Sequence, residues 1–457
     1  FGYILLRLRW GLLALILPTV ISQIITVVYN MADTFFIGQM NDPDQVAAAT
    51  LSLPLFFMLT GIANLFGIGG SSLISRSLGA GDRDKACQGA AFSIWAAAAA
   101  AAAYSAVIWL LRPALLSWLG ADSGTYRYCA DYVLWTTVLG GVPTVLSACL
   151  AHLVRAEGDS LRSSAGIAMG GILNIVLDPI LIFGLGLGVM GAALATMLSN
   201  AAALLYFVLL ILRRRGNMVI RFSPKHFTLS GRIPGDVLLV GFPSFLMMLM
   251  STVSNLTLNK LVVSYSNQAI AGMGIAKKID MLVTAVSNGM TQGVLPLIGY
   301  CYAAGRCDRM REAIKTAFLH SCSIAVGGAA ALSACAPLVI RAFLADEVTV
   351  AYGQHFLRVI CLTCPAVSIT MMTICIFQAT GQKGRPLLLS LLRKGGLDIP
   401  FMFLMNAAAG ADGIPWATPI SDALSMLTAL ALVLPYWHGM KTGIQNNDLP
   451  AGREPND

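Results

Sequence analysis

The chain has 457 residues, of which 57% are hydrophobic and only 11% are charged, and its mean hydropathy is +0.74. A soluble domain carries about 25% charged residues, so this composition excludes a soluble protein and predicts an integral membrane protein. A formal net charge of +8 would suggest nucleic acid as the partner of a soluble protein. Here the basic residues lie in short loops between apolar runs, so we interpret them as topology signals and expect no nucleic-acid partner.

About 20 apolar residues span a bilayer as a helix. By this measure the sequence predicts an all-α protein with twelve membrane-spanning helices. Lys and Arg are concentrated in every second loop, which predicts that both termini are cytoplasmic. We expect the polar tail after residue 438 to be disordered. The predicted spans are 11–37, 46–75, 88–111, 127–153, 163–184, 189–212, 236–264, 268–300, 313–340, 352–378, 385–408 and 412–437.

The two halves of the chain repeat each other. GVMGAALATMLSNAAAL begins at Gly188, and the similar GADGIPWATPISDALSM begins 222 residues later at Gly410. An even number of helices in each half gives both halves the same orientation. We therefore predict two six-helix lobes related by a pseudo-two-fold axis along the membrane normal. The predicted parts are an N-terminal lobe (1–212), a cytoplasmic linker (213–235), a C-terminal lobe (236–438) and the tail (439–457).

The stretch YNMADTFFIG at 29–38 places one carboxylate, Asp33, inside the first span. A charged side chain at membrane depth costs about 3 kcal/mol or more, so such residues face a partner or a water-filled cavity. We therefore predict that Asp33 binds a cation or a proton. Pro18 lies in the same span, and prolines within spans are typical of helices that can bend.

Helix spacing brings other polar residues to the depth of Asp33. Asp178 lies about 9 Å from the predicted outer end of its helix and Asp33 about 6 Å from its own. Asn174 lies one turn below Asp178, and Tyr29 one turn below Asp33, on the same helix faces. Thr196 lies about 10 Å inside the following helix. These five side chains are the predicted cation-binding or coupling site.

Pro179 strengthens this prediction, because a proline in a helix leaves the carbonyl four residues earlier without its usual donor. Carboxylates, an amide oxygen, a hydroxyl and a free carbonyl suit Na⁺. Without a metal, two neighbouring carboxylates would instead share a proton. A purely structural role, with Asp178 bonded to a neighbouring helix and Thr196 and Tyr29 serving as packing residues, is the alternative.

The second half carries a less symmetric set of polar residues. Lys277 and Asp280 are three residues apart and can pair on one helix face. Asp398 and Asp422 are further intramembrane acids, and Arg393 and Lys394 lie within about one turn of Asp398. Asn255 occupies the repeat position of Asn30. These residues form a possible second-lobe polar site, although a structural ion-pair role is at least as well supported.

No motif points to catalysis or to a cofactor. The ten cysteines lie in or beside apolar spans, and Cys361-x-x-Cys364 has no second pair near it. The sequence contains no phosphate loop, no HExxH motif and no GxSxG motif in a suitable setting. We therefore expect neither an enzyme nor a cofactor-binding protein.

Three stretches resemble the multidrug and toxic compound extrusion (MATE) family, in its DinF-like and MepA-like branch. They are LPTVISQIITVVYNMADTFFIG, SRSLGAGDRDKA, and NIVLDPILIFGLGLGVMGAALAT. The resemblance implies two six-helix lobes in a V and drug export driven by Na⁺ or H⁺. By motif position it assigns the cation site to Asp33, Asn174, Asp178 and Thr196. It also implies that Tyr29 and a bend at Pro18 take part in a rearrangement of the first helix.

The predicted function is therefore secondary active multidrug export in a bacterial inner membrane, with Na⁺ or H⁺ moving inward. The expected substrates are amphiphilic or cationic drugs, which would link the protein to antibiotic resistance. Membrane lipids are the other expected contact, and we expect a monomer. A flippase for a lipid-linked cell-envelope precursor is the main alternative, since the lobe architecture also serves that role. The two-lobe repeat argues against a passive channel.

Overall fold

A computed structural model describes residues 8–442 except 41, 215, 217, 230, 264, 266 and 342–346. Within these ranges every regular element is helical, which confirms the all-α prediction. The helices of the first half are α2 (Leu8–Gly38), α3 (Pro43–Gly79), α4 (Arg83–Trp118), α5 (Tyr126–Val133), α6 (Gly141–Ala156), α7 (Ser160–Pro179) and α8 (Val189–Arg213). Those of the second half are α9 (Ile233–Val263), α10 (Asn267–Ala303), α11 (Cys307–Arg341), α12 (Glu347–Cys361), α13 (Cys364–Ala379), α14 (Gly384–Leu391), α15 (Asp398–Gly413) and α16 (Ala417–Thr442).

Each of the twelve predicted spans is helical, and most helices extend a few residues beyond the prediction. Nine helices in the described chain are long and apolar enough to cross a membrane alone. Two more spans consist of bent pairs: α5 with α6 at 46°, and α12 with α13 at 41°. The span predicted at 385–408 is helical from Gly384 to Gly413. It carries Arg393, Lys394 and Asp398 within six positions, so its composition alone is a weak membrane signal.

Short π-helices and 3-10 turns connect or interrupt several spans. The π-helices are η1 (Leu134–Leu139), η2 (Ile180–Gly184) and η4 (Leu392–Leu397), and the 3-10 turns are η3 (Pro224–His226) and η5 (Ile414–Trp416). A π-helix contains one residue more per turn than an α-helix and is often associated with functional sites. Two of the three π-helices adjoin intramembrane acids, since η2 follows Asp178 within two residues and η4 ends directly before Asp398.

The internal repeat is visible in backbone geometry. Gly188 has φ 56° and ψ −137°, and its repeat partner Gly410 has φ 61° and ψ −138°. Glycine adopts this conformation without strain, whereas other residues do not. Both halves of the repeat therefore form the same glycine turn before their last helix. The bends also correspond, because the break at Gly140 in the first half matches the break after Cys361 in the second.

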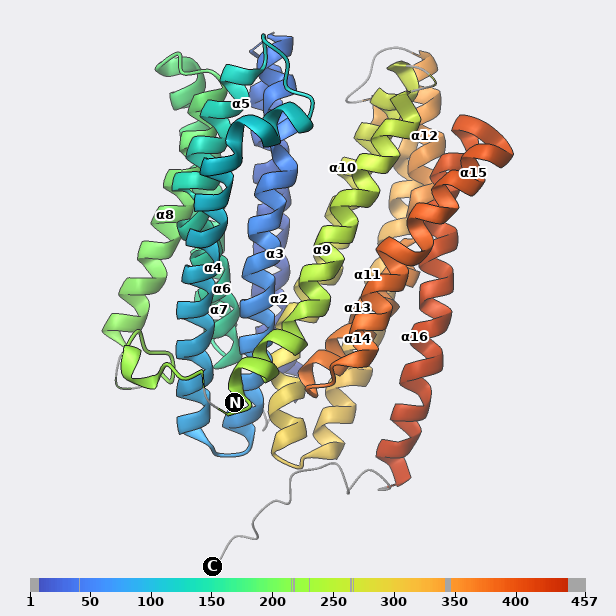
Figure 1. Ribbon diagram of the computed structural model, residues 1–457. Coiled ribbons are helices and arrows are strands. Elements are labelled where there is room, and N and C mark those ends of the chain that lie inside the picture. The colour runs from blue at the N-terminus through green and yellow to red at the C-terminus, as the bar shows by residue number, and fades with distance from the viewer. Residues whose placement is uncertain are drawn as a thin grey trace, which may run out of the picture. The chain divides into compact units, whose positions relative to one another are not determined.

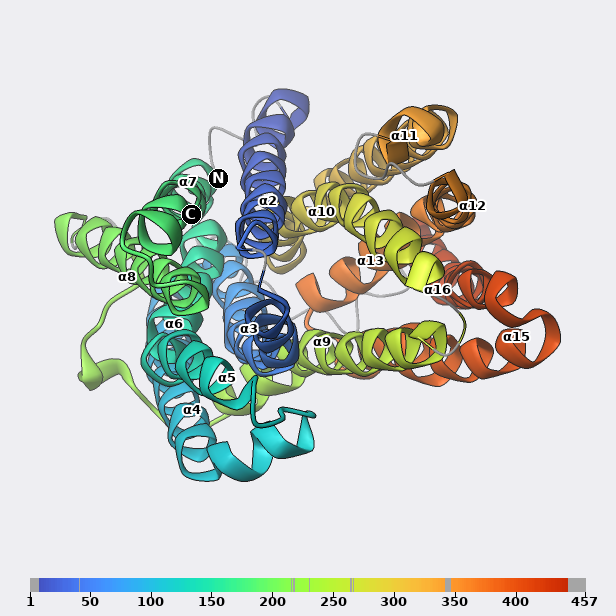
Figure 2. The same cartoon turned by 90° about the horizontal axis from the view of Figure 1, so that it is seen from above.

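The chain forms two compact units whose limits cut across two helices. One unit comprises residues 21–78 and 82–248, and the other comprises 1–20, 79–81 and 249–457. Helix α2 therefore divides at Val20/Ile21, three residues after Pro18, and α9 divides at Met248/Leu249. The lobe limits 1–212 and 236–438 and their symmetry axis stay predictions. Figures 1 and 2 show that the helices within each unit run side by side.

Glycines allow close helix crossings within the first of these units. A methyl group at Gly69 would lie 2.0 Å from the carbonyl oxygen of Val237, and one at Gly241 would lie 1.8 Å from that of Leu65. Helices α3 and α9 therefore cross with their backbones almost in contact, which only small residues permit. This crossing ties the start of α9 to the helices of the first half.

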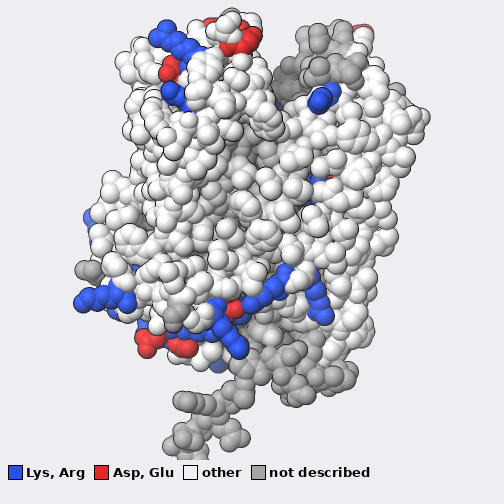
Figure 3. All heavy atoms as spheres, viewed as in Figure 1, with Lys and Arg blue, Asp and Glu red and all other residues white. Residues whose placement is uncertain are grey.

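The loops between helices carry charged residues, and polar side chains in these loops cap the helices that follow. Asp82 accepts a hydrogen bond from the Lys85 amide (2.9 Å) at the start of α4, and Asp159 caps α7 in the same way. Figure 3 shows basic side chains in a band near the lower end of the view, below the long apolar surface of the helices. The predicted tail lies outside the described residues from position 443 onward.

Candidate cation site

The five predicted site residues lie on three helices of one compact unit. Helix α2 carries Tyr29 and Asp33, α7 carries Asn174 and Asp178, and α8 carries Thr196. Asp178 is completely buried and Asn174 is 2% exposed. The other three side chains are half-buried. The common layer that depth arithmetic predicts stays a prediction.

Oxygen acceptors without donors dominate this layer. Asn174 Nδ2 lies 3.5 Å from Thr196 Oγ1, at the long limit of a hydrogen bond. Within the described chain, Asp33 Oδ1, Asn174 Oδ1 and both carboxylate oxygens of Asp178 are buried and have no hydrogen-bond partner. An unsatisfied buried polar group costs about 1–3 kcal/mol, so a cation or proton that accepts these lone pairs would stabilise the site.

The acids and two phenols interact electrostatically. Asp33 lies within electrostatic range of Asp178, and Tyr29 lies within range of both. Tyr132 on α5 interacts with the same two carboxylates and with Tyr29, and it is only 4% exposed. We did not predict Tyr132 from the sequence. The sequence did offer one signal for Tyr132, because it lies five residues into the predicted span 127–153, or about 8 Å deep.

Local packing sets the positions of these helices. A methyl group at Gly171 would lie 3.0 Å from the Tyr29 ring and 3.0 Å from Ile25, so glycine lets α7 approach α2 closely. The Val189 amide donates to Gln45 Oε1 (2.7 Å), which fixes the start of α8 and hence the depth of Thr196. Both contacts hold the oxygen-bearing side chains on rigid helices.

The helix that carries Asp178 changes form immediately after the acid. Pro179 ends the α-helical part of α7, and the π-helix η2 follows, closed by a hydrogen bond from the Leu185 amide to the Ile180 carbonyl (2.9 Å). A proline removes one donor from the helix, and the wider turn accommodates that loss. The free carbonyl of Ile175 as a cation ligand stays a prediction.

The layer fits a small monovalent cation or a proton better than a metal ion that needs three or more His, Cys, Asp or Glu ligands. Within the described residues, no group of three or more His, Cys, Asp or Glu side chains could hold a metal ion. A cation here would rest on two carboxylates, the Asn174 amide oxygen and the Thr196 hydroxyl. Hard oxygen ligands of this kind suit Na⁺, and paired acids also suit a shared proton.

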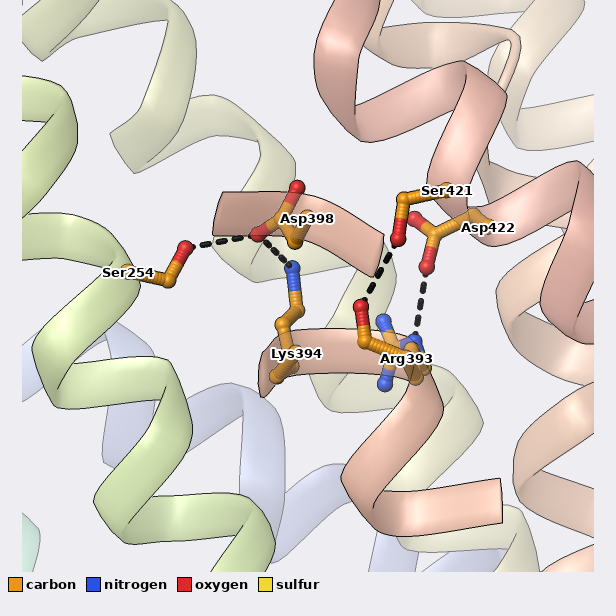
Figure 4. A network of polar contacts seen from close by, with 6 residues as sticks. All are labelled: Ser254, Arg393, Lys394, Asp398, Ser421 and Asp422. Carbon is orange, nitrogen blue, oxygen red and sulfur yellow. Dashed lines mark hydrogen bonds and ion pairs between the residues drawn. The ribbon is translucent and has the colours of Figure 1, made fainter. Parts of the chain in front are cut away.

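The second-half residues form a separate network, shown in Figure 4. Lys394 pairs with Asp398 (3.4 Å), as the sequence suggests, whereas Arg393 pairs with Asp422 on α16 (2.8 Å). Asp398 also accepts a hydrogen bond from Ser254 (2.6 Å). Asn255, the residue predicted there, is exposed, because it lies about 100° around the helix from its neighbour Ser254.

Lys277 and Asp280 do not form the direct pair that their spacing allows. Each interacts electrostatically with the other and with the network, but among the described residues the two have no ion pair within 4.0 Å. All ten cysteines are free thiols, including Cys361 and Cys364, which flank the break between α12 and α13. Cys361 and Cys364 lie within electrostatic range of Asp280.

Comparison with known proteins identifies relatives over most of the chain. The MatE family profile matches residues 18–180 and 243–404. A multidrug export protein, MepA, from Staphylococcus haemolyticus (strain JCSC1435) is 30% identical over 417 residues, covering 91% of each chain. MepA from Staphylococcus aureus (strain NCTC 8325 / PS 47) is 32% identical over the same length and coverage.

Solved structures share the fold. An outward-facing multidrug resistance MATE family transporter of the MOP superfamily superimposes with a TM-score of 0.88 at 24% identity, covering 94% of this chain and 96% of that one. A MOP superfamily transporter from Pyrococcus furiosus, described as having a binding pocket of reverse polarity, gives 0.85 at 25% identity, with the same coverage.

Proposed function

Because this chain belongs to the MatE family, which consists of transporters and not enzymes, we propose that it is a secondary active exporter. It moves small organic compounds, often cationic and amphiphilic, out of the cell. Inward movement of Na⁺ or H⁺ drives this export. The names of the MepA relatives, both multidrug export proteins, support the substrate class.

The observation that carries this proposal is the set of four buried acceptor oxygens on Asp33, Asn174 and Asp178. A cation or proton satisfies them, and its departure leaves them unpaired again. A cation that binds these oxygens more tightly in one conformation than in another shifts the balance between the two, which is the requirement for coupling a gradient to a conformational change. Thr196 and Tyr29 complete the oxygen shell, and the freed carbonyl before Pro179 is its further ligand.

The first helix supplies a route from the site to the rest of the protein. Helix α2 carries Asp33 in one compact unit, and its first turns, including Pro18, belong to the other. A proline in a helix lacks one hydrogen bond and bends at low cost. In this mechanism, cation binding at Asp33 and Asp178 bends α2 at Pro18, and the bend closes the drug cavity and expels its contents.

We place the protein in a bacterial inner membrane as a monomer with both termini cytoplasmic. Lipid surrounds the apolar helices, and no nucleic acid or cofactor takes part. The sequence halves, 1–212 and 236–438, act as the two lobes of the transport cycle, joined by the segment 213–235. The concentration of Lys and Arg in every second loop of the sequence supports this orientation.

The lipid-flippase alternative is less well supported. A lipid-linked phosphate requires free basic groups in the membrane region. Arg393 is held by Asp422, and Lys394 lies against Asp398. These two ion pairs are therefore charge-balanced, which weakens the support that Arg393 and Lys394 give to diphosphate binding.

The test is efflux of ethidium from proteoliposomes under a Na⁺ gradient alone and under a pH gradient alone. We expect efflux under one of the two, which identifies the coupling ion. Asp33→Asn should abolish it, because the neutral amide cannot balance the cation. The matched control is Asp131→Asn, which removes a half-buried acid from α5 outside the cluster. Full gradient-driven efflux by Asp33→Asn at normal expression would overturn the proposal.

A further inference from the structure

The second polar network contains two ion pairs that differ in tightness. In one pair, Arg393 Nε lies 2.8 Å from Asp422 Oδ1, and the side chains are 6% and 2% exposed. In the other, Lys394 Nζ lies 3.4 Å from Asp398 Oδ2, and the side chains are 15% and 1% exposed. Lys394 is thus the most accessible of the four groups and makes the longer contact. All four belong to one compact unit.

The π-helix η4 separates the two pairs. It places the successive residues Arg393 and Lys394 toward different partners, Asp422 on α16 and Asp398 at the start of α15 (Figure 4). Ser421 holds the Arg393 carbonyl with a hydrogen bond of 2.8 Å. Arg393 is therefore fixed by its backbone as well as by its ion pair, whereas Lys394 precedes two glycines, Gly395 and Gly396, and has no corresponding clamp.

Asp398 has unused capacity to accept hydrogen bonds. Its Oδ2 atom receives Ser254 at 2.6 Å and Lys394 at 3.4 Å. Its Oδ1 atom is buried and, in the described chain, has no partner. A buried carboxylate oxygen left unpaired is costly, and a cationic donor is its best partner. The neutral serine, and not the lysine, makes the shorter of the two contacts.

A second acid is available to receive Lys394. Asp280 on α10 interacts electrostatically with Lys394 and Lys277, and among the described residues it has no direct ion pair. A lysine has four side-chain torsions and can move between two nearby acids. Moving Lys394 from Asp398 toward Asp280 opens Asp398 without leaving the displaced charge uncompensated.

We propose that Asp398 binds the cationic group of the exported compound and that Lys394 is an internal cation that occupies Asp398 until the compound displaces it. The ligand is an organic cation whose charged group carries N–H donors, such as an amino-substituted phenanthridinium. This assignment rests on the proposed export function and gives it a substrate-recognition residue. Arg393 and Asp422 are the fixed structural pair beside this exchangeable one.

The test measures ethidium binding to the purified full-length protein in detergent at pH 8, by fluorescence anisotropy. Lys394→Met removes the competing cation and keeps the apolar stem. A competitor that occupies a site for nine-tenths of the time lowers the apparent affinity about tenfold, so we expect binding to tighten roughly three- to tenfold. Asp398→Asn should weaken binding about tenfold or more, because a charge-assisted contact is lost.

Matched controls isolate the charge exchange. Lys278→Met removes a half-buried lysine that, among the described residues, interacts with no charged group, and it should leave affinity unchanged. Lys394→Met in an Asp398→Asn background should give no tightening. The uncharged parent of ethidium, 3,8-diamino-6-phenylphenanthridine, should bind wild type and Lys394→Met equally. If Asp398→Asn does not fold, the comparison of Lys394→Met with Lys278→Met still decides.

Unchanged or weaker ethidium binding by folded Lys394→Met rejects the exchange. The same follows if Lys278→Met tightens binding equally. The proposed export function is judged separately, by gradient-driven efflux from wild type and its loss in Asp33→Asn. If those two results hold and Lys394→Met has no effect, only the second-unit site is rejected. If no gradient drives efflux, the export function is rejected, and tightening by Lys394→Met then shows a cation site without export.

Discussion

Replacing Asp178 by asparagine should stabilise the cation-free protein while destroying its function. Asp178 is completely buried, and within the described chain both of its carboxylate oxygens lack partners. An asparagine retains one acceptor and supplies an amide donor within electrostatic range of Asp33, whose Oδ1 atom has no partner among the described residues. The substitution thus removes one unpaired oxygen and satisfies another.

The magnitude follows from the cost of unpaired buried groups, which is about 1–3 kcal/mol each. Two such changes would give about 2–6 kcal/mol, and relaxation of the side chains in both proteins reduces this gain to roughly 2–4 kcal/mol. A gain of 1 kcal/mol raises the melting temperature by about 2–4 °C in a domain of 150–250 residues and by less in a longer chain. We expect a rise of roughly 2–5 °C at pH 8 without the coupling ion.

The assay compares thermal melting of wild type and Asp178→Asn with and without the ion that drives efflux. A ligand that binds only the folded state stabilises wild type, and the mutant should lose this shift. Asp131→Asn controls for the loss of one acid from the membrane region. A lower melting temperature for Asp178→Asn without the ion, or an ion-induced shift equal to that of wild type, would falsify this account of the unpaired oxygens.

Three further outcomes are expected. Tyr132→Phe should weaken coupling-ion affinity a few-fold and leave maximal efflux near wild type, because Tyr132 interacts with both acids without supplying charge; an ion titration of efflux measures this. Gly410→Ala should destabilise the protein by about 1–2 kcal/mol, since φ is 61° there, whereas Gly384→Ala, in open space at ordinary φ, should not; melting curves compare them. Glu157 accepts the amides of Val219 (2.8 Å) and Ile220 (2.9 Å) outside the membrane spans, and burial raises its pKa from 4.5 to about 7. When residues 218–227 are docked on Glu157, its carboxyl group holds a proton over a wider pH range than when they are undocked. Docking is therefore most stable below pH 4.5 and weakens by up to about 1.4 kcal/mol per pH unit as pH rises to 7. Hydrogen exchange at residues 218–227 should follow this trend and lose it in Glu157→Gln.

Depth in the membrane could be predicted from the sequence, whereas rotation about each helix could not. The shared layer of Asp33, Asp178 and Thr196 follows from counting residues at a fixed rise per residue. Ser254 and Asn255 have nearly the same depth, yet only Ser254 meets Asp398. The facing side of a helix depends on its packing against neighbours, so the sequence could not indicate that Ser254 joins the network, and a role for Asn255 stays a prediction.

Irregular turns were the second source of error. Arg393 and Lys394 both lie near Asp398 in sequence, but η4 sends Arg393 to Asp422 instead. A π-helix changes the angular position of every later residue, and its occurrence depends on tertiary contacts such as the Ser421 hydrogen bond.

The sequence by itself determined the membrane class, the twelve helices, the internal repeat and the acidic layer of the first half. These properties depend on apolar length, charge and position along one axis, which a linear chain records directly. Only the tertiary structure decided that Tyr132 joins the acids and that Lys394 is the looser partner in the second network. It also decided that Asp33 Oδ1 and both carboxylate oxygens of Asp178 have no hydrogen-bond partner within the described chain. Such facts depend on which side chains meet across helices distant in sequence, and the packing of the whole bundle sets those contacts.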